Sequence, residues 1–197
     1  MPPDNPSPED PRIRRSRAAV LEAALDELAE RGYGGFPLDG VASRAGVARS
    51  TVYRLWRDRP SLIADAMETL NRQPPPLDPG VEPPRQRITT LLRHLAEAMD
   101  GSRVSACLPA VIEGAEHDDR LRALHHGYAV RRGAALVQAL ADARVAGAVG
   151  DHVDPERTAA ALAGAVFYRR LMTDRPLAVD EVDDLVASVL GPVVALK

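Results

Sequence analysis

The fold of this chain is decided by one stretch of its sequence, LDGVASRAGVARSTVYRLW (residues 38–56). Within it the small residue Ala42 is followed four positions later by Gly46, and the β-branched Val52 comes six positions after that glycine. Ala42 lets a second helix cross closely over the first, and Gly46 can adopt the left-handed backbone conformation that ends a helix and turns the chain. Val52 then fills the space between the two helices. The spacing therefore predicts a helix-turn-helix.

The two predicted helices cover about residues 38–45 and 48–55, and the second has a polar outer face. Arginine, serine and tyrosine side chains on such a face suit the phosphate oxygens and base edges of DNA. We expect Arg49 to read bases, because an arginine at the start of a recognition helix reaches the groove floor and binds guanine O6 and N7 bidentately. Two further arginines suit phosphate contacts, Arg44 and Arg54. Ser50 and Tyr53 complete the face.

Charge is distributed unevenly along the chain. Residues 12–59 contain ten arginines against six acidic residues, a net charge of +4, whereas residues 60–197 carry a net −4. The whole chain has a formal net charge of only −3, so it is not a polycation. This asymmetry favours a DNA-binding head on a body that has another kind of partner. The alternative is an ordinary helical hairpin with a solvated basic face.

Apolar residues recur at helical spacing along most of the sequence, and no alternation typical of strands stands out. We therefore predict an all-α chain of about nine helices. Asp58, Asp118 and Asp154 are the expected helix caps, and Pro109 is expected to kink or restart a helix near residues 102–114. The predicted parts are a disordered tail (1–11), a helix-turn-helix DNA-binding domain (12–58), a connecting helix (59–73), a proline-rich linker (74–84) and a helical dimerisation and effector domain (85–197).

Four short motifs resemble the tetracycline-repressor (TetR) family: AERGY (29–33), VASRAGV (41–47), STVYRLW (50–56) and SLI (61–63). The resemblance covers about residues 12–70, and FYRRLM (167–172) is similar to one subgroup of the family's C-terminal domains. It implies a homodimeric transcription regulator, usually a repressor, that binds a pseudo-palindromic operator. It also implies a divergent C-terminal domain that dimerises and binds a small effector.

The resemblance also assigns roles to single residues of the head. Thr51 and Tyr53 match the family's threonine and tyrosine that contact backbone phosphates. Arg59 stands where the family usually has a lysine at the start of its fourth helix, and it can meet a phosphate with a different donor geometry. Pro37 stands where many members have a threonine that caps the second helix and contacts phosphate, and proline does neither.

The C-terminal part combines apolar residues with a few polar side chains, which is typical both of an effector cavity and of plain core. The residues that would line a cavity for a small apolar effector are Met99, Cys107, Ile112, His125, Tyr128 and Phe167. Residues 155–172 and 180–193 are the expected dimer interface, because Gly164 and its alanine neighbours permit close helix approach. The competing interpretations are intrachain packing of these segments and a regulator that binds no ligand.

Two histidine-containing clusters, His117-Asp118-Asp119 and His125-His126, are the remaining candidates for chemistry. Adjacent histidines on a helix point about 100° apart and do not readily share a metal. We therefore expect no cofactor, no metal and no enzymatic activity, and a metal-binding or enzymatic helical protein is the less favoured hypothesis. Cys107 is the single cysteine. With no signal peptide and no apolar run long enough to cross a membrane, we expect a cytoplasmic protein.

Overall fold

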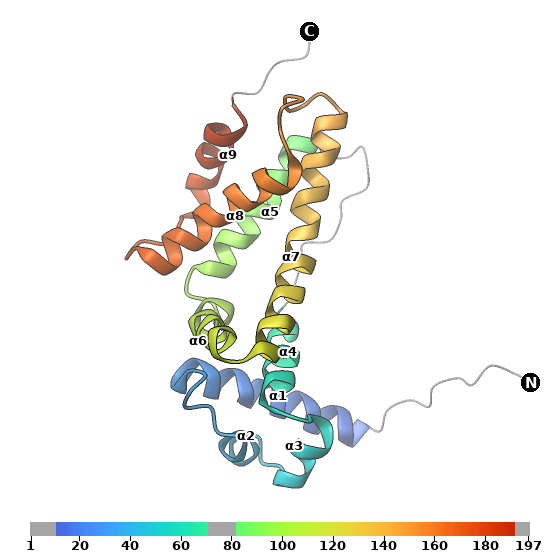
Figure 1. The fold of residues 1–197 in the computed structure, drawn as a ribbon, viewed down its shortest axis with the longest axis vertical. Coiled ribbons are helices and arrows are strands. Elements are labelled where there is room, and N and C mark those ends of the chain that lie inside the picture. Colours follow the sequence, from blue (N-terminus) through green and yellow to red (C-terminus); the bar gives the residue numbers. More distant parts are fainter. Residues whose placement is uncertain (1–10, 71–81, 192–197) are drawn as a thin grey trace, which may run out of the picture. The chain divides into compact units, whose positions relative to one another are not determined.

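The computed structural model describes residues 11–70 and 82–191. Across these residues the chain forms nine α-helices and one 3₁₀ turn, which confirms the all-α prediction (Figure 1). The helices are α1 (Pro11–Arg31), α2 (Leu38–Arg44), α3 (Arg49–Leu55), α4 (Arg59–Thr69), α5 (Pro84–Met99), α6 (Arg103–His117), α7 (Asp119–Val145), α8 (Pro155–Met172) and α9 (Val182–Leu190). Most of the predicted tail and linker, residues 1–10 and 71–81, lies outside the described residues, as do residues 192–197.

The chain divides into two compact units. Unit 1 comprises residues 1–69 and 110–124, and unit 2 comprises residues 70–109 and 125–197. Helices α6 and α7 therefore each contribute to both units. Residues 110–124, which the sequence places in the C-terminal domain, thus group with the N-terminal helices.

In unit 1, α1 packs against both α2 and α4, and α2 packs against α3 (Figure 1). The core between α1 and α4 consists of fully buried aliphatic side chains, among them Val20, Leu25, Leu28, Leu62 and Ile63. Helix α1 ends where Gly32 adopts a φ of +67° and donates its N–H to the carbonyl of Leu28 at 3.0 Å. This left-handed turn is the one that glycine makes at no steric cost.

Aspartates cap three helices, as the sequence predicts. The carboxylate of Asp58 accepts the backbone N–H of Ser61 at 2.9 Å, at the start of α4. Asp118 accepts the N–H of Leu121 at 3.1 Å before α7, and Asp154 accepts that of Arg157 at 2.8 Å before α8. The last helix begins with a different arrangement. A 3₁₀ turn (Val179–Glu181) precedes α9, and the Glu181 carboxylate accepts the N–H of Ala178 at 3.0 Å.

In unit 2, α5 packs against α8 and α9, and α8 also packs against α9. Of the two outcomes expected at Pro109, a kink or a restart, the restart does not occur, because α6 is one continuous helix from Arg103 to His117. Proline lacks the N–H that would bond the carbonyl four residues earlier, which is that of Ser105. A guanidinium N–H of Arg170 on α8 donates to this carbonyl at 2.9 Å. The side chain therefore satisfies the acceptor that Pro109 leaves open, and the helix continues.

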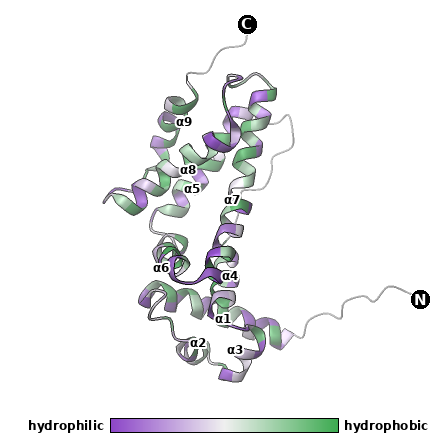
Figure 2. Ribbon diagram, viewed as in Figure 1, coloured by the Kyte–Doolittle hydropathy of each residue, from purple (hydrophilic) through white to green (hydrophobic). Residues whose placement is uncertain are grey.

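Hydrophobic and hydrophilic residues are interspersed along the helices of both units (Figure 2). Within residues 11–70 and 82–191, no helix has the length and apolar character required to span a membrane.

Candidate DNA-binding surface

Helices α2 and α3 form the helix-turn-helix that the spacing of residues 38–56 predicts. Gly46 lies in the left-handed region with a φ of +65°, and its N–H donates to the carbonyl of Ser43 at 3.2 Å. The N–H of Val47 reaches back to the carbonyl of Ala42 at 3.1 Å, which closes the end of α2. Ala42 and Val52 are buried between the helices. The turn thus fixes the crossing of α3 over α2.

The face of α3 that points away from α2 is exposed and polar. Tyr53 has 55% of its surface exposed, and Arg49, the first residue of the helix, has a side chain that is 70% exposed. Ser50 and Arg54 are exposed as well, and Thr51 is half-buried. The structure therefore brings four of the predicted DNA-facing side chains onto one accessible helix face.

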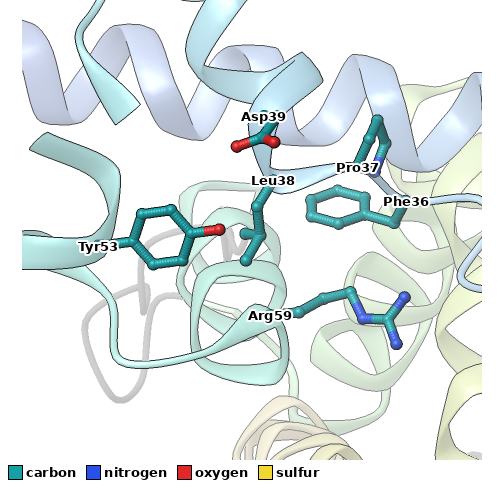
Figure 3. Close-up of a pocket in the computed structure, with 6 residues that line it drawn as sticks. All are labelled: Phe36, Pro37, Leu38, Asp39, Tyr53 and Arg59. Carbon is teal, nitrogen blue, oxygen red and sulfur yellow. The ribbon is translucent and has the colours of Figure 1, made fainter. Parts of the chain in front are cut away.

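An open hollow of about 310 Å³ lies beside this face (Figure 3). It is lined by residues from the loop before α2, from α2 itself, from α3 and from the start of α4: Phe36, Pro37, Leu38, Asp39, Tyr53 and Arg59. The Tyr53 hydroxyl points into the hollow, with Leu38 between the Tyr53 and Phe36 rings, while the Arg59 guanidinium points away from Tyr53. Pro37 precedes α2 and gives it no side-chain cap, in agreement with the sequence argument.

Two family descriptions match this chain. Residues 20–66 match "Bacterial regulatory proteins, tetR family", and residues 80–189 match "Tetracyclin repressor-like, C-terminal domain". The chain belongs to the TetR family. It is accordingly a transcriptional regulator with a helix-turn-helix DNA-binding head. The comparison confirms the resemblance found in the sequence.

Among its relatives is the HTH-type transcriptional regulator YdeS of Bacillus subtilis, 27% identical over 176 residues, or 88% of this chain and 85% of YdeS. The regulator Mb0790c of Mycobacterium bovis is 34% identical over 149 residues, 73% of this chain and 65% of Mb0790c. Solved structures share the fold. NalD of Pseudomonas aeruginosa, 19% identical, has a TM-score of 0.71 over 93% of this chain and 98% of its own. AibR was solved with isovaleryl coenzyme A and operator DNA. It is 20% identical, with a TM-score of 0.66, and the match covers 90% of this chain and 99% of AibR.

In this TetR-family head, Arg49 has a partner that was not among the predicted site residues. Its guanidinium Nη1 lies 2.9 Å from a carboxylate oxygen of Asp39, the second residue of α2. Both side chains are accessible, with 70% and 46% of their surfaces exposed. The sequence does contain a signal for this pair. Asp39 lies ten positions before Arg49, and the turn between α2 and α3 brings the two residues together.

Arg44, predicted to contact phosphate, points to α1. Its Nε donates to the carboxylate of Glu27 at 2.9 Å, and its terminal nitrogens pair with both oxygens of Glu30. The hydrogen bond that Arg44 donates to Glu30 is the main reason that the pKa of Glu30 lies below its usual value. Glu27 is almost completely buried, and Arg31 also reaches it at 2.7 Å. A phosphate contact by Arg44 would require it to exchange these carboxylates for DNA.

Arg59, the other predicted phosphate ligand outside α3, is likewise held within unit 1. It donates to the backbone carbonyl of Tyr33 at 3.0 Å, and its guanidinium carbon lies 4.3 Å from the centre of the Tyr33 ring. The Tyr33 hydroxyl donates to the capping carboxylate of Asp118 at 2.6 Å. Arg120 on α7 pairs with the α4 cap Asp58 at 2.5 Å. We call these five side chains the α4–α7 polar network.

Burial and charge shift two pKa values in the α4–α7 polar network. Burial, reinforced by the hydrogen bond to Asp118, raises the pKa of Tyr33 to about 12. The same hydrogen bond, followed by those from the backbone N–H groups of Leu121 and Arg120, lowers the pKa of Asp118. Both shifts favour a neutral phenol that donates to an ionised carboxylate at neutral pH.

The six predicted effector residues are divided between the units. Met99 and Cys107 are buried and His125, Tyr128 and Phe167 are half-buried in unit 2, whereas Ile112 belongs to unit 1. Burial lowers the pKa of His125, and its ring centre lies 6.1 Å from that of His126. No group of three or more histidine, cysteine, aspartate or glutamate side chains suitable for a metal occurs within the described residues.

Helix α8 carries an exposed strip at helical spacing. Met172 is 71% exposed and Tyr168 is 62% exposed, and Gly164 and Ala161 continue the strip toward the start of the helix. A Cβ atom added at Gly164 would meet nothing within 4 Å. On α9, Val189 is also exposed. The apolar side chains of α8 that face the core are different ones, Ala159, Leu162 and Val166.

Proposed function

We propose that the chain is a homodimeric repressor whose two copies of α3 enter successive major grooves of a pseudo-palindromic operator, and that a small, largely apolar effector releases it. The observation that carries this proposal is the accessible outer face of α3, where Arg49, Ser50, Tyr53 and Arg54 lie on one side of a TetR-family helix-turn-helix. Such side chains supply base-edge and phosphate contacts. The proposal places the chain in the cytoplasm with its DNA.

The proposed dimer forms through α8 and α9, within residues 155–172 and 180–193. The exposed apolar strip of α8 supports this assignment, because neighbouring exposed apolar side chains such as Tyr168 and Met172 are typical of an interaction surface. The open space at Gly164 allows the backbone of a second copy to approach closely. A two-fold axis would then set the separation of the two recognition helices and hence of the half-sites.

Effector binding would reach the head along α6 and α7, since each of these helices contributes to both units. Asp118 lies between them and binds Tyr33, which in turn is held by Arg59 at the start of α4. A shift of the α6–α7 turn would therefore act on α4 and on the spacing of the heads. That AibR was solved with isovaleryl coenzyme A and operator DNA supports an organic effector for this fold.

The operator can be found by sequencing the genomic fragments that the purified full-length chain retains. We expect an inverted repeat whose half-site centres are separated by about one helical turn of DNA or a multiple of it. Compounds that raise the melting temperature of the chain are then tested for release of this operator. A tenfold lower operator affinity at saturating compound corresponds to a coupling free energy of about 1.4 kcal/mol. If every stabilising compound left operator binding unchanged, a regulator without a ligand would replace this proposal.

The dimer is tested by Gly164→Phe, with Gly133→Phe as the matched control. Both glycines are helical, and a Cβ atom added to either meets nothing within 4 Å. Analytical ultracentrifugation of the Gly164→Phe chain should show weakened dimerisation, with operator affinity falling in parallel, because the ring occupies the space of the second copy. The Gly133→Phe chain should stay dimeric. A wild-type chain that is monomeric at micromolar concentration would contradict the proposal.

A further inference from the structure

Asp39 is an acidic residue on the surface that the proposed function turns toward DNA. It belongs to the first turn of α2 and lines the same hollow as Tyr53 (Figure 3). A carboxylate beside DNA phosphates is unfavourable, because like charges repel and no counterion is released by the contact. Its partner at 2.9 Å is Arg49, and within the described residues Arg49 forms an ion pair with no other carboxylate.

The geometry of a guanidinium explains what this pair can do. Arginine has five N–H donors in a rigid planar fork, and one contact to a carboxylate leaves an entire edge of the fork available. That remaining edge matches O6 and N7 of guanine. With 70% of its side chain exposed, Arg49 is free to present this edge while its Nη1 stays on Asp39. The pair therefore reduces the number of orientations that Arg49 samples before it meets a base.

We infer that Asp39 is a specificity-determining positioning residue, which holds Arg49 for base reading and penalises its use as a phosphate ligand. If Arg49 turns to a phosphate, it leaves the Asp39 carboxylate unpaired beside the DNA backbone. If Arg49 reads a base, the carboxylate keeps its partner. Asp39 thus weakens binding to unrelated sequences more than binding to the operator. The inference rests on the proposed reading of bases by Arg49.

A purely structural role for Asp39 makes a different prediction. Acidic residues in the first turn of a helix are favourable because of the helix dipole, and α2 is short and has no side-chain cap. In that role, removal of the charge would destabilise α2 and weaken binding to all DNA sequences by the same factor. The base preference of the chain would not change. Base preference is therefore the measurement that separates the two roles.

The experiment compares the full-length wild-type chain with Asp39→Asn, Asp39→Glu and Arg49→Ala in selections from a randomised duplex library, followed by affinity measurements at several salt concentrations. Asn preserves the shape of Asp39 without the charge, and Glu preserves the charge. The matched control is Glu30→Gln, which removes one negative charge from the head at a residue paired with Arg44. Thermal unfolding of each variant confirms that it is folded.

We expect Arg49→Ala to abolish the preference at one base position in each half-site. Asp39→Asn should lower that preference by about threefold and tighten binding to unrelated duplexes at low salt by a similar factor, an effect that fades as salt rises. Asp39→Glu should retain part of the preference, and Glu30→Gln should retain all of it. If Arg49→Ala loses preference but Asp39→Asn does not, or if Glu30→Gln matches Asp39→Asn, this inference fails while base reading stands. If Arg49→Ala keeps the preference, both fail.

Discussion

The two sides of the helix-turn-helix head use the same residue types in opposite surroundings. On the outer face of α3, the side chains of Arg49 and Tyr53 are 70% and 55% exposed. On the inner side of the same unit, Arg44 is bound by carboxylates of α1, Arg59 is stacked on a buried tyrosine, and that tyrosine, Tyr33, donates to the cap of α7. The outer side chains are largely exposed, although Arg49 also pairs with Asp39 of α2, whereas the inner ones connect helices through buried or partly buried contacts.

This contrast shows that residue type and position near a recognition helix do not determine whether an arginine is already engaged by other side chains of the fold. An arginine already paired with carboxylates gains little when it exchanges them for a phosphate, since one charge-assisted hydrogen bond replaces another. Arg44 would give up Glu27 and Glu30 in such an exchange. Substitutions on the outer side should therefore change DNA affinity, whereas substitutions on the inner side should change the free energy of unfolding.

The largest effect is expected when both outer arginines are removed. The Arg49→Ala/Arg54→Ala chain should bind each half-site of its operator about 100-fold more weakly, because each copy of α3 loses one base contact and one phosphate contact at about 1.4 kcal/mol each, and the dimer incurs this loss at both half-sites. Fluorescence anisotropy with labelled operator measures this loss. The melting temperature should not change, since exposed substitutions usually alter stability by less than about 0.5 kcal/mol. Arg131→Ala, which removes an exposed charge from α7 in unit 2, outside the proposed dimer interface, is the control and should bind normally. A large fall in melting temperature would place these arginines with the inner set.

On the inner side, Glu27→Ala should lower the free energy of unfolding by about 2 kcal/mol, because Glu27 is 4% exposed and its charge-assisted hydrogen bond with Arg44 is lost. Urea denaturation measures the change. Glu30→Ala is the matched control: Glu30 also binds Arg44, but its side chain is 54% exposed, so water replaces the lost contact. Equal losses for the two variants would show that burial of Glu27 contributes nothing.

The sequence was sufficient to predict what depends on local spacing. The helix-turn-helix follows from Ala42, Gly46 and Val52, and the structure places all three as expected. The capping roles of Asp118 and Asp154 also depend on only a few neighbouring residues. The exposed positions of Arg49 and Tyr53 follow from the helical period once α3 is placed.

The inner contacts depend on residues far apart in the chain, which local patterns do not encode. Tyr33 and its partner Asp118 are 85 positions apart. Arg170, which satisfies the carbonyl that Pro109 leaves open in α6, is 65 positions from Ser105. The expectation that proline interrupts a helix rests on its lost N–H and takes no account of a donor elsewhere in the chain that can bond the open carbonyl. For the same reason the sequence predicts a phosphate contact for Arg59 and gives no sign of its contact with Tyr33.

The two tyrosines give a pH test of the comparison. Burial, followed by the hydrogen bond to Asp118, raises the pKa of Tyr33 to about 12 in the folded chain, above its value of about 10 in the unfolded chain. A raised folded pKa means that the stabilisation is complete below pH 10 and is lost as the pH rises from about 10 to 12. Urea denaturation across this range should show the loss in the wild type.

Tyr33→Phe should show less of this alkaline dependence and should be about 1 kcal/mol less stable at neutral pH, because one buried hydrogen bond is missing. At low pH the stability changes in the opposite direction with pH, because the group that titrates is the Asp118 carboxylate. The hydrogen bonds from Tyr33 and from the α7 backbone lower the pKa of Asp118, so its contribution is present above the unfolded pKa and is lost as the pH falls through the folded one. An unchanged alkaline profile in Tyr33→Phe would show that Tyr33 is not responsible.

The smallest effect is expected at the outer tyrosine. Tyr53→Phe keeps the ring and removes only the hydroxyl, which points into the open hollow beside α3 (Figure 3). If this hydroxyl contacts a backbone phosphate, its loss should weaken binding to operator and to unrelated duplexes by the same factor, about threefold, because a phosphate contact carries no sequence information. Stability and its pH dependence should match the wild type, in contrast to Tyr33→Phe. Parallel titrations with operator and scrambled duplex decide the point: a loss confined to the operator would make Tyr53 a base-reading residue, and a loss of stability would place it with the inner side of the head.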